Sequence, residues 1–379
     1  EWVLKKVKAE IGDLYPLIPD PEYKGNRPAV QSDMWLSPDK ESIHPGYLVP
    51  VAYLWTRTVR CKNPACGATV PLVRQTWLRK KKNHYVALRM IAPKGEKKVR
   101  FEVVESPTEA GLGFDPAAFS KAGNASCPFC GTVADSDYVK QEGQAGRLSQ
   151  QMMAIVCTRP GRQGKIYLSA DDYPQYLPDD EAVQKRIEAL CHRTGLTVPN
   201  EPMDTNDPTT VAGRGFGIKT FSELFTPRQM LCLLTFAAAV REACQTMVGQ
   251  ATGLPATGEP TAPPMSQERA KAVGTYLGVL VNRQADYNST LCHWLNTVEA
   301  LGNTFGRQAL PMVWDFVEVN PIGGGPGGAA GALDWIASVA DAQAGSGLPA
   351  TVKRGSATAL PWSNAFFDAV ITDPPYYDN

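Results

Sequence analysis

The sequence predicts an α/β protein with an inserted β-rich module and helical segments. Two cysteine pairs enclose short segments in which apolar and polar residues alternate, as in strands. Two longer segments place small and apolar residues at three- and four-residue intervals, a spacing typical of helices that pack on a sheet. Residues 365–372 form an apolar run with the pattern of a buried strand. Together these patterns favour a mixed α/β fold.

Individual elements follow from local signals. Thr226 has the position of a helix cap, with Pro227 at the first helical position and Gln229 three residues after the cap. This signal predicts a helix to about residue 247, followed by a break at 251–264 and a second helix over 266–287. The other expected elements are strands at 51–59, 85–90, 99–104 and 312–319 and helices at 179–190 and 333–342.

Composition limits the classes of protein to consider. The 379 residues, 43% of them hydrophobic, are enough for two or three domains with apolar cores. The 38 basic and 38 acidic residues cancel, so contact with nucleic acid would need a local basic patch. The longest strongly apolar stretch, near 230–240, is shorter than the roughly 18 residues that span a bilayer, and no signal-peptide core opens the chain. We therefore expect a cytoplasmic protein without a membrane partner.

The chain divides into four predicted parts. Residues 1–60 are an irregular lead-in segment, 61–150 a metal module, 151–265 a linker with a helical insertion, and 266–379 part of an α/β domain. The first residue is Glu1 rather than Met, and the last residues closely follow an apolar run. We expect the sequence to be a piece of a longer protein.

The metal module is predicted from cysteine spacing. Cys61 and Cys66 are followed by a glycine, as are Cys127 and Cys130, so each pair can place two thiolates on one tight turn. Four thiolates around one ion form a closed structural zinc site, which stabilises a fold and performs no chemistry. Buried free thiols and an iron–sulfur cluster remain alternatives. The adjacent pairs 191–192 and 292–293, each Cys-His, are not assigned as ligands because neighbouring side chains point apart.

A basic segment lies between the cysteine pairs. Residues 74–100 contain ten basic residues and a single acid, with aromatic residues interleaved. Such a patch can bind DNA phosphates; a solvated hairpin tip is the alternative interpretation. The candidate DNA-binding residues are Arg79, Lys80, Lys81 and Lys82.

The motif that follows the apolar run at 365–372 carries the chemistry. Asp373, Pro374, Pro375 and Tyr376 come after a predicted strand, and open α/β sheets bind ligands at the carboxyl ends of their strands. Two prolines keep the chain extended and leave carbonyls free to accept hydrogen bonds. Asp373 and the Pro374 carbonyl suit an exocyclic amine, and Tyr376 offers a face on which an extruded base can stack. A proline-rich turn after a core strand is the alternative.

These motifs, together with CKNPACGATVPL, SCPFCG, FSELFTPRQM and NTFGRQALPMVWDFVEVNP, resemble the adenine-specific DNA methylases that contain a zinc ribbon. Those are prokaryotic enzymes, often linked to phage defence. The resemblance implies a Rossmann-like methyltransferase with an inserted zinc ribbon that uses S-adenosylmethionine and acts on adenine N6 in double-stranded DNA. It also implies Asp373 to Tyr376 as the catalytic motif, a role in restriction-modification or phage defence, and partner proteins from the same defence system.

The glycine-rich cofactor motif of that family is absent here, so we expect this fragment alone to be inactive. Gly323-x-Gly325-x-x-Gly328 is too close to Gly355 for the elements of a nucleotide-binding half-domain, and a flexible surface loop is expected instead. Relatives present a loop near Gly355 to the adenine ring of the cofactor, which makes Ser356 a candidate contact, although an ordinary turn explains it equally well. Methylation of cytosine N4, or a zinc-dependent nucleic-acid-binding module without catalysis, are the alternative functions.

Overall fold

The computed structural model describes residues 1–27, 45–120, 123–204, 206–207, 209–251, 265–306, 309–325, 327–345 and 350–373. The chain divides into two units, Glu1–Ile336 and Ala337–Asn379. The predicted segments 1–60, 61–150 and 151–265 all contribute to the first unit, while 266–379 is shared between the two.

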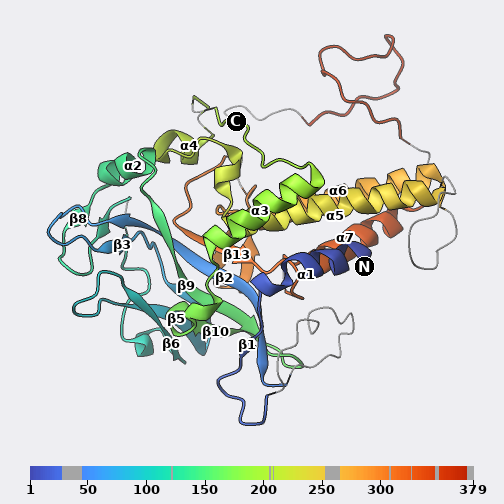
Figure 1. The fold of residues 1–379 in the computed structure, drawn as a ribbon. Helices are drawn as coiled ribbons and strands as arrows, with labels where there is room; N and C mark the ends of the chain where they lie inside the picture. Colours follow the sequence, from blue (N-terminus) through green and yellow to red (C-terminus); the bar gives the residue numbers. More distant parts are fainter. Residues whose placement is uncertain are drawn as a thin grey trace. The chain divides into compact units, whose positions relative to one another are not determined.

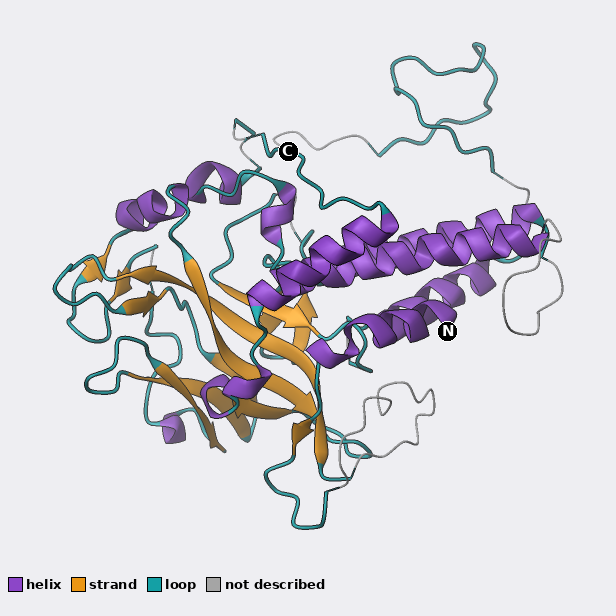
Figure 2. Ribbon diagram, viewed as in Figure 1, coloured by secondary structure: helices purple, strands orange, loops and turns teal. Residues whose placement is uncertain are grey.

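An antiparallel sheet forms the centre of the first unit (Figure 2). One edge of its longest strand, β2 (Tyr47–Arg60), pairs with β9 (Ser149–Thr158), which in turn pairs with β10 (Ile166–Ser169). The other edge of β2 is shared by three short strands that follow one another along it. They are β1 (Ile18–Pro19), β13 (Asp315–Val319) and β3 (Thr69–Pro71).

The predicted mixed α/β class is therefore confirmed. Every strand pairing among the described residues is antiparallel, however, so the parallel sheet of a Rossmann-like domain is not found in that part of the chain. β2 is buried along nearly its whole length because both faces of the sheet are covered. That explains why its first part, residues 47–55, is continuously apolar rather than alternating.

Helices cover one face of the sheet (Figure 1). The two predicted long helices are α5 (Pro227–Ala251) and α6 (Gln267–Tyr287), which pack on each other, and α1 (Trp2–Ile11) and α3 (Asp180–Thr194) pack on α5. Their buried side chains meet Tyr53, Trp55 and other residues of the sheet in one hydrophobic cluster.

The cap predicted for α5 is confirmed in detail. The Thr226 hydroxyl accepts a hydrogen bond from the backbone N–H of Gln229 (3.2 Å), and the Gln229 side chain accepts one from the N–H of Thr226 (2.9 Å). This reciprocal pair is a capping box. By length and composition alone α5 could also cross a membrane; a core helix of a soluble protein passes the same test.

The opposite face of the sheet carries a smaller three-stranded sheet. Its strands are β4 (Trp77–Lys81), β5 (His84–Ile91) and β6 (Arg100–Ser106), and the last two confirm the predicted strands. A hairpin of β11 (His293–Leu295) and β12 (Ala300–Gly302) lies beside them. A short helix, α4 (Val211–Phe216), lies within the segment 151–265 that was predicted to be a linker with a helical insertion. A second hydrophobic cluster joins these layers through residues such as Leu54, Leu88 and Met153.

A buried ion pair connects α5 to β13. Arg228 donates to both carboxylate oxygens of Glu318 (2.6 and 3.0 Å) and to the carbonyl of Leu14 (3.0 Å). Its guanidinium also lies 4.2 Å from the ring centroid of Tyr53. Both charged side chains are inaccessible to solvent, with exposed fractions of 1% and 0%. A buried ion pair is stable only when its geometry and hydrogen bonds offset the free-energy cost of removing both charged groups from water.

The glycine-rich segment at 323–328 links β13 to α7 (Ala329–Gln343). Gly323 and Gly328 are buried, and a Cβ at Gly325 would lie 2.8 Å from Val51. The expectation of a surface loop is therefore wrong for these positions, because the glycines allow the backbone to pack closely against β2.

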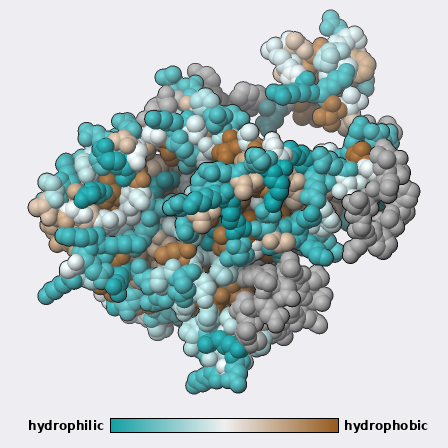
Figure 3. All heavy atoms as spheres, in the orientation of Figure 1, coloured by the Kyte–Doolittle hydropathy of each residue, from teal (hydrophilic) through white to brown (hydrophobic). Residues whose placement is uncertain are grey.

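The second unit contains the end of α7 and residues 350–373. The predicted strand at 365–372 is wrong: this segment is irregular, and Ile371 is 97% exposed. Figure 3 shows apolar residues on the surface of this unit. No strand pairs with the segment among the described residues, so its backbone groups and apolar side chains have no sheet in which to be buried.

Candidate metal centre and adjoining pocket

The first cysteine pair sits where β2 ends. The backbone N–H of Cys61 donates to Ala68 (2.8 Å), and the N–H groups of Cys66 and Gly67 both donate to the carbonyl of Asn63 (3.0 and 3.2 Å). Gly67 has a φ of +61°, a conformation in which glycine avoids the steric cost of a side chain. The turn therefore presents both sulfurs on one side.

The second pair repeats this arrangement between two short strands, β7 (Ala125–Ser126) and β8 (Val133–Ala134). The N–H of Cys127 donates to Thr132 and the N–H of Gly131 donates back to Cys127, both at 2.9 Å. Gly131 has a φ of +74°, so it has the same role as the glycine of the first turn.

The fold brings all four predicted ligands together. Cys61 Sγ lies 3.6 Å from Cys130 Sγ, Cys66 Sγ lies 3.8 Å from Cys127 Sγ, and the four sulfurs are within 4.8 Å of one another. A tetrahedron with zinc–sulfur distances of about 2.3 Å has edges of about 3.8 Å. The cluster therefore has the size for one tetrahedral ion, with no room for the sulfides of an iron–sulfur cluster.

The thiols differ in their environment. Burial raises the pKa of Cys61 to about 12 and also raises that of Cys127. Hydrogen bonds with the side chain and backbone of Thr132 lower the pKa of the exposed Cys130 to about 6. A metal ion must therefore displace protons from the two buried thiols, and its binding free energy then contributes to folding.

The metal cluster is joined to the rest of the unit. A helix, α2 (Ser136–Gln144), follows the second turn, and its cap residue Asp135 forms an ion pair with Lys62 of the first turn. The hydroxyl of Tyr138 donates to the carbonyl of Arg60 (3.1 Å). Cys61 and Cys127 also pack in a hydrophobic cluster that includes Trp314, which precedes β13. The module and the central sheet thus share a core.

Among the described residues, the His, Cys, Asp and Glu side chains form no second candidate metal cluster.

The predicted DNA-binding residues lie at the β4–β5 hairpin, where three of the four form ion pairs with acidic residues. Arg79 and Lys81 both form ion pairs with the buried Glu299, and Lys80 pairs with Glu109 at 3.1 Å. Lys82 is exposed in the turn. These ion pairs reduce the positive charge that the hairpin offers to phosphates, so its contact with DNA stays a prediction.

The remaining predicted site residues lie apart from the metal centre in the sequence and belong to the second unit. Ser356 is exposed, and its hydroxyl accepts a hydrogen bond from the N–H of Thr358 (3.2 Å), as in an ordinary turn. Asp373 is exposed. Pro374, Pro375 and Tyr376 lie outside the described residues.

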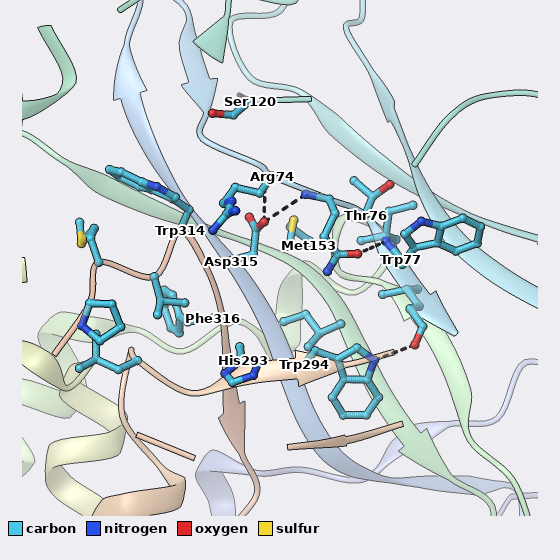
Figure 4. Close-up of a pocket in the computed structure, with 18 of the residues that line it drawn as sticks. Arg74, Thr76, Trp77, Ser120, Met153, His293, Trp294, Trp314, Asp315 and Phe316 are labelled. Atoms are coloured by element: carbon cyan, nitrogen blue, oxygen red, sulfur yellow. Dashed lines mark hydrogen bonds between the residues drawn. The ribbon is translucent and has the colours of Figure 1, made fainter. Parts of the chain in front are cut away.

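A pocket of about 930 Å³ adjoins the metal module (Figure 4). It opens between the central sheet, the β4–β6 sheet and the β11–β12 hairpin. The sequence gives no local signal for it, because its walls come from loops and strands as far apart in the chain as Leu54 and Phe316. Its residues include Arg74, Gln75, Trp77, Trp294, Trp314 and Asp315.

Asp315 fixes the loop at the pocket wall. Its Oδ2 accepts hydrogen bonds from the backbone N–H groups of Arg74 (2.8 Å) and Gln75 (3.4 Å). Burial raises the pKa of Asp315 to about 6, although these hydrogen bonds oppose the shift. The folded state therefore holds its proton more tightly than the unfolded state does.

We expect an Asp315→Asn variant to reveal this shift as a pH-dependent stability difference. The protonated carboxyl of Asp315 stabilises the folded state fully at pH values below the unfolded pKa, near 3.8. This stabilisation is lost as the pH rises through the folded pKa of about 6. Between pH 4 and pH 8 the wild type should lose roughly 2–3 kcal/mol of unfolding free energy relative to the variant. Urea unfolding of both proteins across this range measures the difference, and a constant difference would contradict the assignment.

The fold and the site thus define a mixed α/β protein with a cluster of four cysteines that could hold one metal ion. Comparisons of the chain with protein-family models, curated proteins and solved structures give no match.

Proposed function

We propose that the chain is the zinc-containing portion of an S-adenosylmethionine-dependent DNA methyltransferase that acts on adenine N6. The observation that carries the catalytic part is the sequence Asp373-Pro374-Pro375-Tyr376. The closely spaced sulfurs of the four cysteines support the zinc-ribbon part. Double-stranded DNA is the proposed substrate, in a cytoplasmic restriction-modification or defence system.

In this proposal Asp373 and the carbonyl of Pro374 accept the two hydrogens of the adenine amine, which leaves its lone pair available for the methyl group. Tyr376 stacks on the extruded base. S-adenosylmethionine supplies the methyl group. Neither Ser356, which is exposed in a turn, nor the closely packed Gly323, Gly325 and Gly328 form a site that fits this cofactor.

The test is transfer of a labelled methyl group from S-adenosylmethionine to DNA, with the protein in the longest form that its gene encodes. We expect Asp373→Ala to abolish incorporation, because the motif loses its side-chain acceptor for the amine. Asp368→Ala, a change at an exposed acid in the same segment, should keep activity near that of the wild type. Equal activity of the two variants would refute the role of Asp373.

Mass spectrometry of the nucleosides identifies the product. N6-methyladenine supports the proposal, and N4-methylcytosine assigns the enzyme to the other amine. Absence of any methylated base, together with bound zinc and bound DNA, would favour a zinc-dependent nucleic-acid-binding module. The irregular, exposed state of residues 350–373 is the observation that keeps this second function open.

A further inference from the structure

We propose that the pocket beside the metal module binds one nucleotide unit, with the planar base inside and the phosphate at Arg74. This inference rests on the nucleic-acid part of the proposed function and is independent of methyl transfer. The pocket belongs entirely to the first unit and does not include the motif at Asp373.

The interior suits a flat heteroaromatic ring. Leu54, Leu88 and Met153 supply apolar lining. Trp77 and Trp314 are almost fully buried, at 8% and 9% exposure, so they act as fixed walls. Trp294 is only partly buried, which makes it the indole available for stacking.

The Trp294 ring is held in place before any ligand arrives. Its Nε1 donates to the carbonyl of Leu78 (2.6 Å), and Lys165 Nζ lies 5.5 Å from its ring centroid. A fixed aromatic ring loses little conformational freedom when a base stacks on it, so more of the contact energy remains as affinity.

Arg74 places a positive charge at the pocket. It is exposed, and the structure gives its side chain no hydrogen bond or ion pair with other described residues. Its backbone is fixed by Asp315 through the 2.8 Å hydrogen bond. A guanidinium binds phosphate oxygens through a planar set of donors. This contrasts with Arg79 and Lys81, which are already paired with Glu299.

The combination favours a nucleotide over an apolar peptide. An apolar side chain would use the aromatic walls but give the Arg74 guanidinium no hydrogen-bond acceptor, whereas a nucleotide uses both features. The volume of about 930 Å³ lies in the range of small-molecule pockets and is sufficient for a base with its sugar and phosphate. Stacking on aromatic residues combined with a basic contact is how proteins hold unpaired bases.

The experiment uses a single-stranded DNA oligonucleotide that carries one 2-aminopurine, whose fluorescence is quenched when it stacks. We expect the wild type to bind and quench this probe. Arg74→Gln should weaken binding about tenfold at low salt and reduce the salt dependence by about one phosphate contact. Trp294→Leu should weaken binding by roughly tenfold or more, and Trp294→Phe should restore much of it.

Arg162→Gln is the matched control, because Arg162 is exposed in the turn after β9 and does not line the pocket. Melting temperatures establish which variants are folded, and Arg74→Gln, a change at an exposed side chain, keeps the test valid if Trp294→Leu does not fold. Binding by Arg74→Gln and by a folded Trp294→Leu variant that equals the control, or binding by Arg74→Gln that equals the control together with no quenching by the wild type, would overturn the proposal.

Competitors identify the source of the nucleotide. Displacement of the probe by free dAMP assigns the pocket to mononucleotides, and displacement only by unlabelled strands assigns it to nucleic acid; both support a nucleotide site. Displacement by S-adenosylhomocysteine and not by dAMP would refute the proposal, since the pocket would then hold the cofactor. Nucleotide binding in the pocket without methyl transfer would support the nucleotide site and refute the proposed methyltransferase activity. Methyl transfer without nucleotide binding in the pocket would support the activity and refute the nucleotide site.

Discussion

Replacing Cys127 by alanine is expected to release the metal and to lower the unfolding free energy by about 4 kcal/mol or more. The variant leaves three thiolates around an ion that needs four, and two of them, Cys61 and Cys66, belong to the other turn. The hydrophobic cluster around the metal is small, so it cannot hold the two turns together alone. Urea unfolding followed by tryptophan fluorescence, with zinc measured by elemental analysis, tests this expectation.

Cys191→Ala is the matched control for that measurement. Cys191 is partly buried on α3 and is not among the four clustered sulfurs. This variant should keep its zinc and should have an unfolding free energy close to that of the wild type. A Cys127→Ala protein that did the same would show that the cysteine cluster does not stabilise the fold through a metal.

Arg228→Met is expected to destabilise the protein by about 3–5 kcal/mol, because Glu318 would remain buried without its partner. Replacing both residues, as Arg228→Met with Glu318→Leu, should recover much of this loss. The recovery stays incomplete because Trp55 Nε1, which donates to Glu318 (3.0 Å), loses its acceptor. Thermal and urea unfolding of the single and double variants provides the comparison.

A surface ion pair supplies the control for the buried one. Arg193 pairs with Glu10 at 2.9 Å, with side-chain exposures of 60% and 38%. Arg193→Met should therefore change stability by less than about 1 kcal/mol. If Arg228→Met lowered the unfolding free energy as little as Arg193→Met does, the buried ion pair would not stabilise the contact between α5 and β13.

Local signals predicted the elements that local interactions stabilise. The capping box of α5 joins residues three positions apart, and each cysteine turn is closed by hydrogen bonds between residues at most seven positions apart. Both features are therefore readable from short stretches of sequence. The nearest cysteines of the two turns, Cys66 and Cys127, are 61 positions apart, and their meeting was predicted only because four thiolates complete a metal site.

Features that depend on distant contacts were not predictable. Glu299, which pairs with Arg79 and Lys81, is more than 200 positions away from them, so the hairpin looked more basic in the sequence than it is in the fold. The pocket has the same origin, since Arg74 and Asp315 meet only through the sheet. The apolar run at 365–372 shows the converse error. Its apolar pattern indicates that the segment can be buried. A strand also needs a neighbouring strand, because its backbone N–H and C=O groups must form hydrogen bonds.

Cobalt substitution shows directly whether Cys61, Cys66, Cys127 and Cys130 form a closed four-thiolate metal site. The protein is freed of metal under reducing conditions and titrated with Co²⁺ while its absorption spectrum is recorded. We expect saturation at one equivalent, with strong sulfur-to-cobalt charge-transfer bands and the visible bands of a tetrahedral ion, all displaced by one equivalent of Zn²⁺. An octahedral spectrum without charge-transfer bands, or no saturable binding, would contradict the assignment of Cys61, Cys66, Cys127 and Cys130 as a metal site.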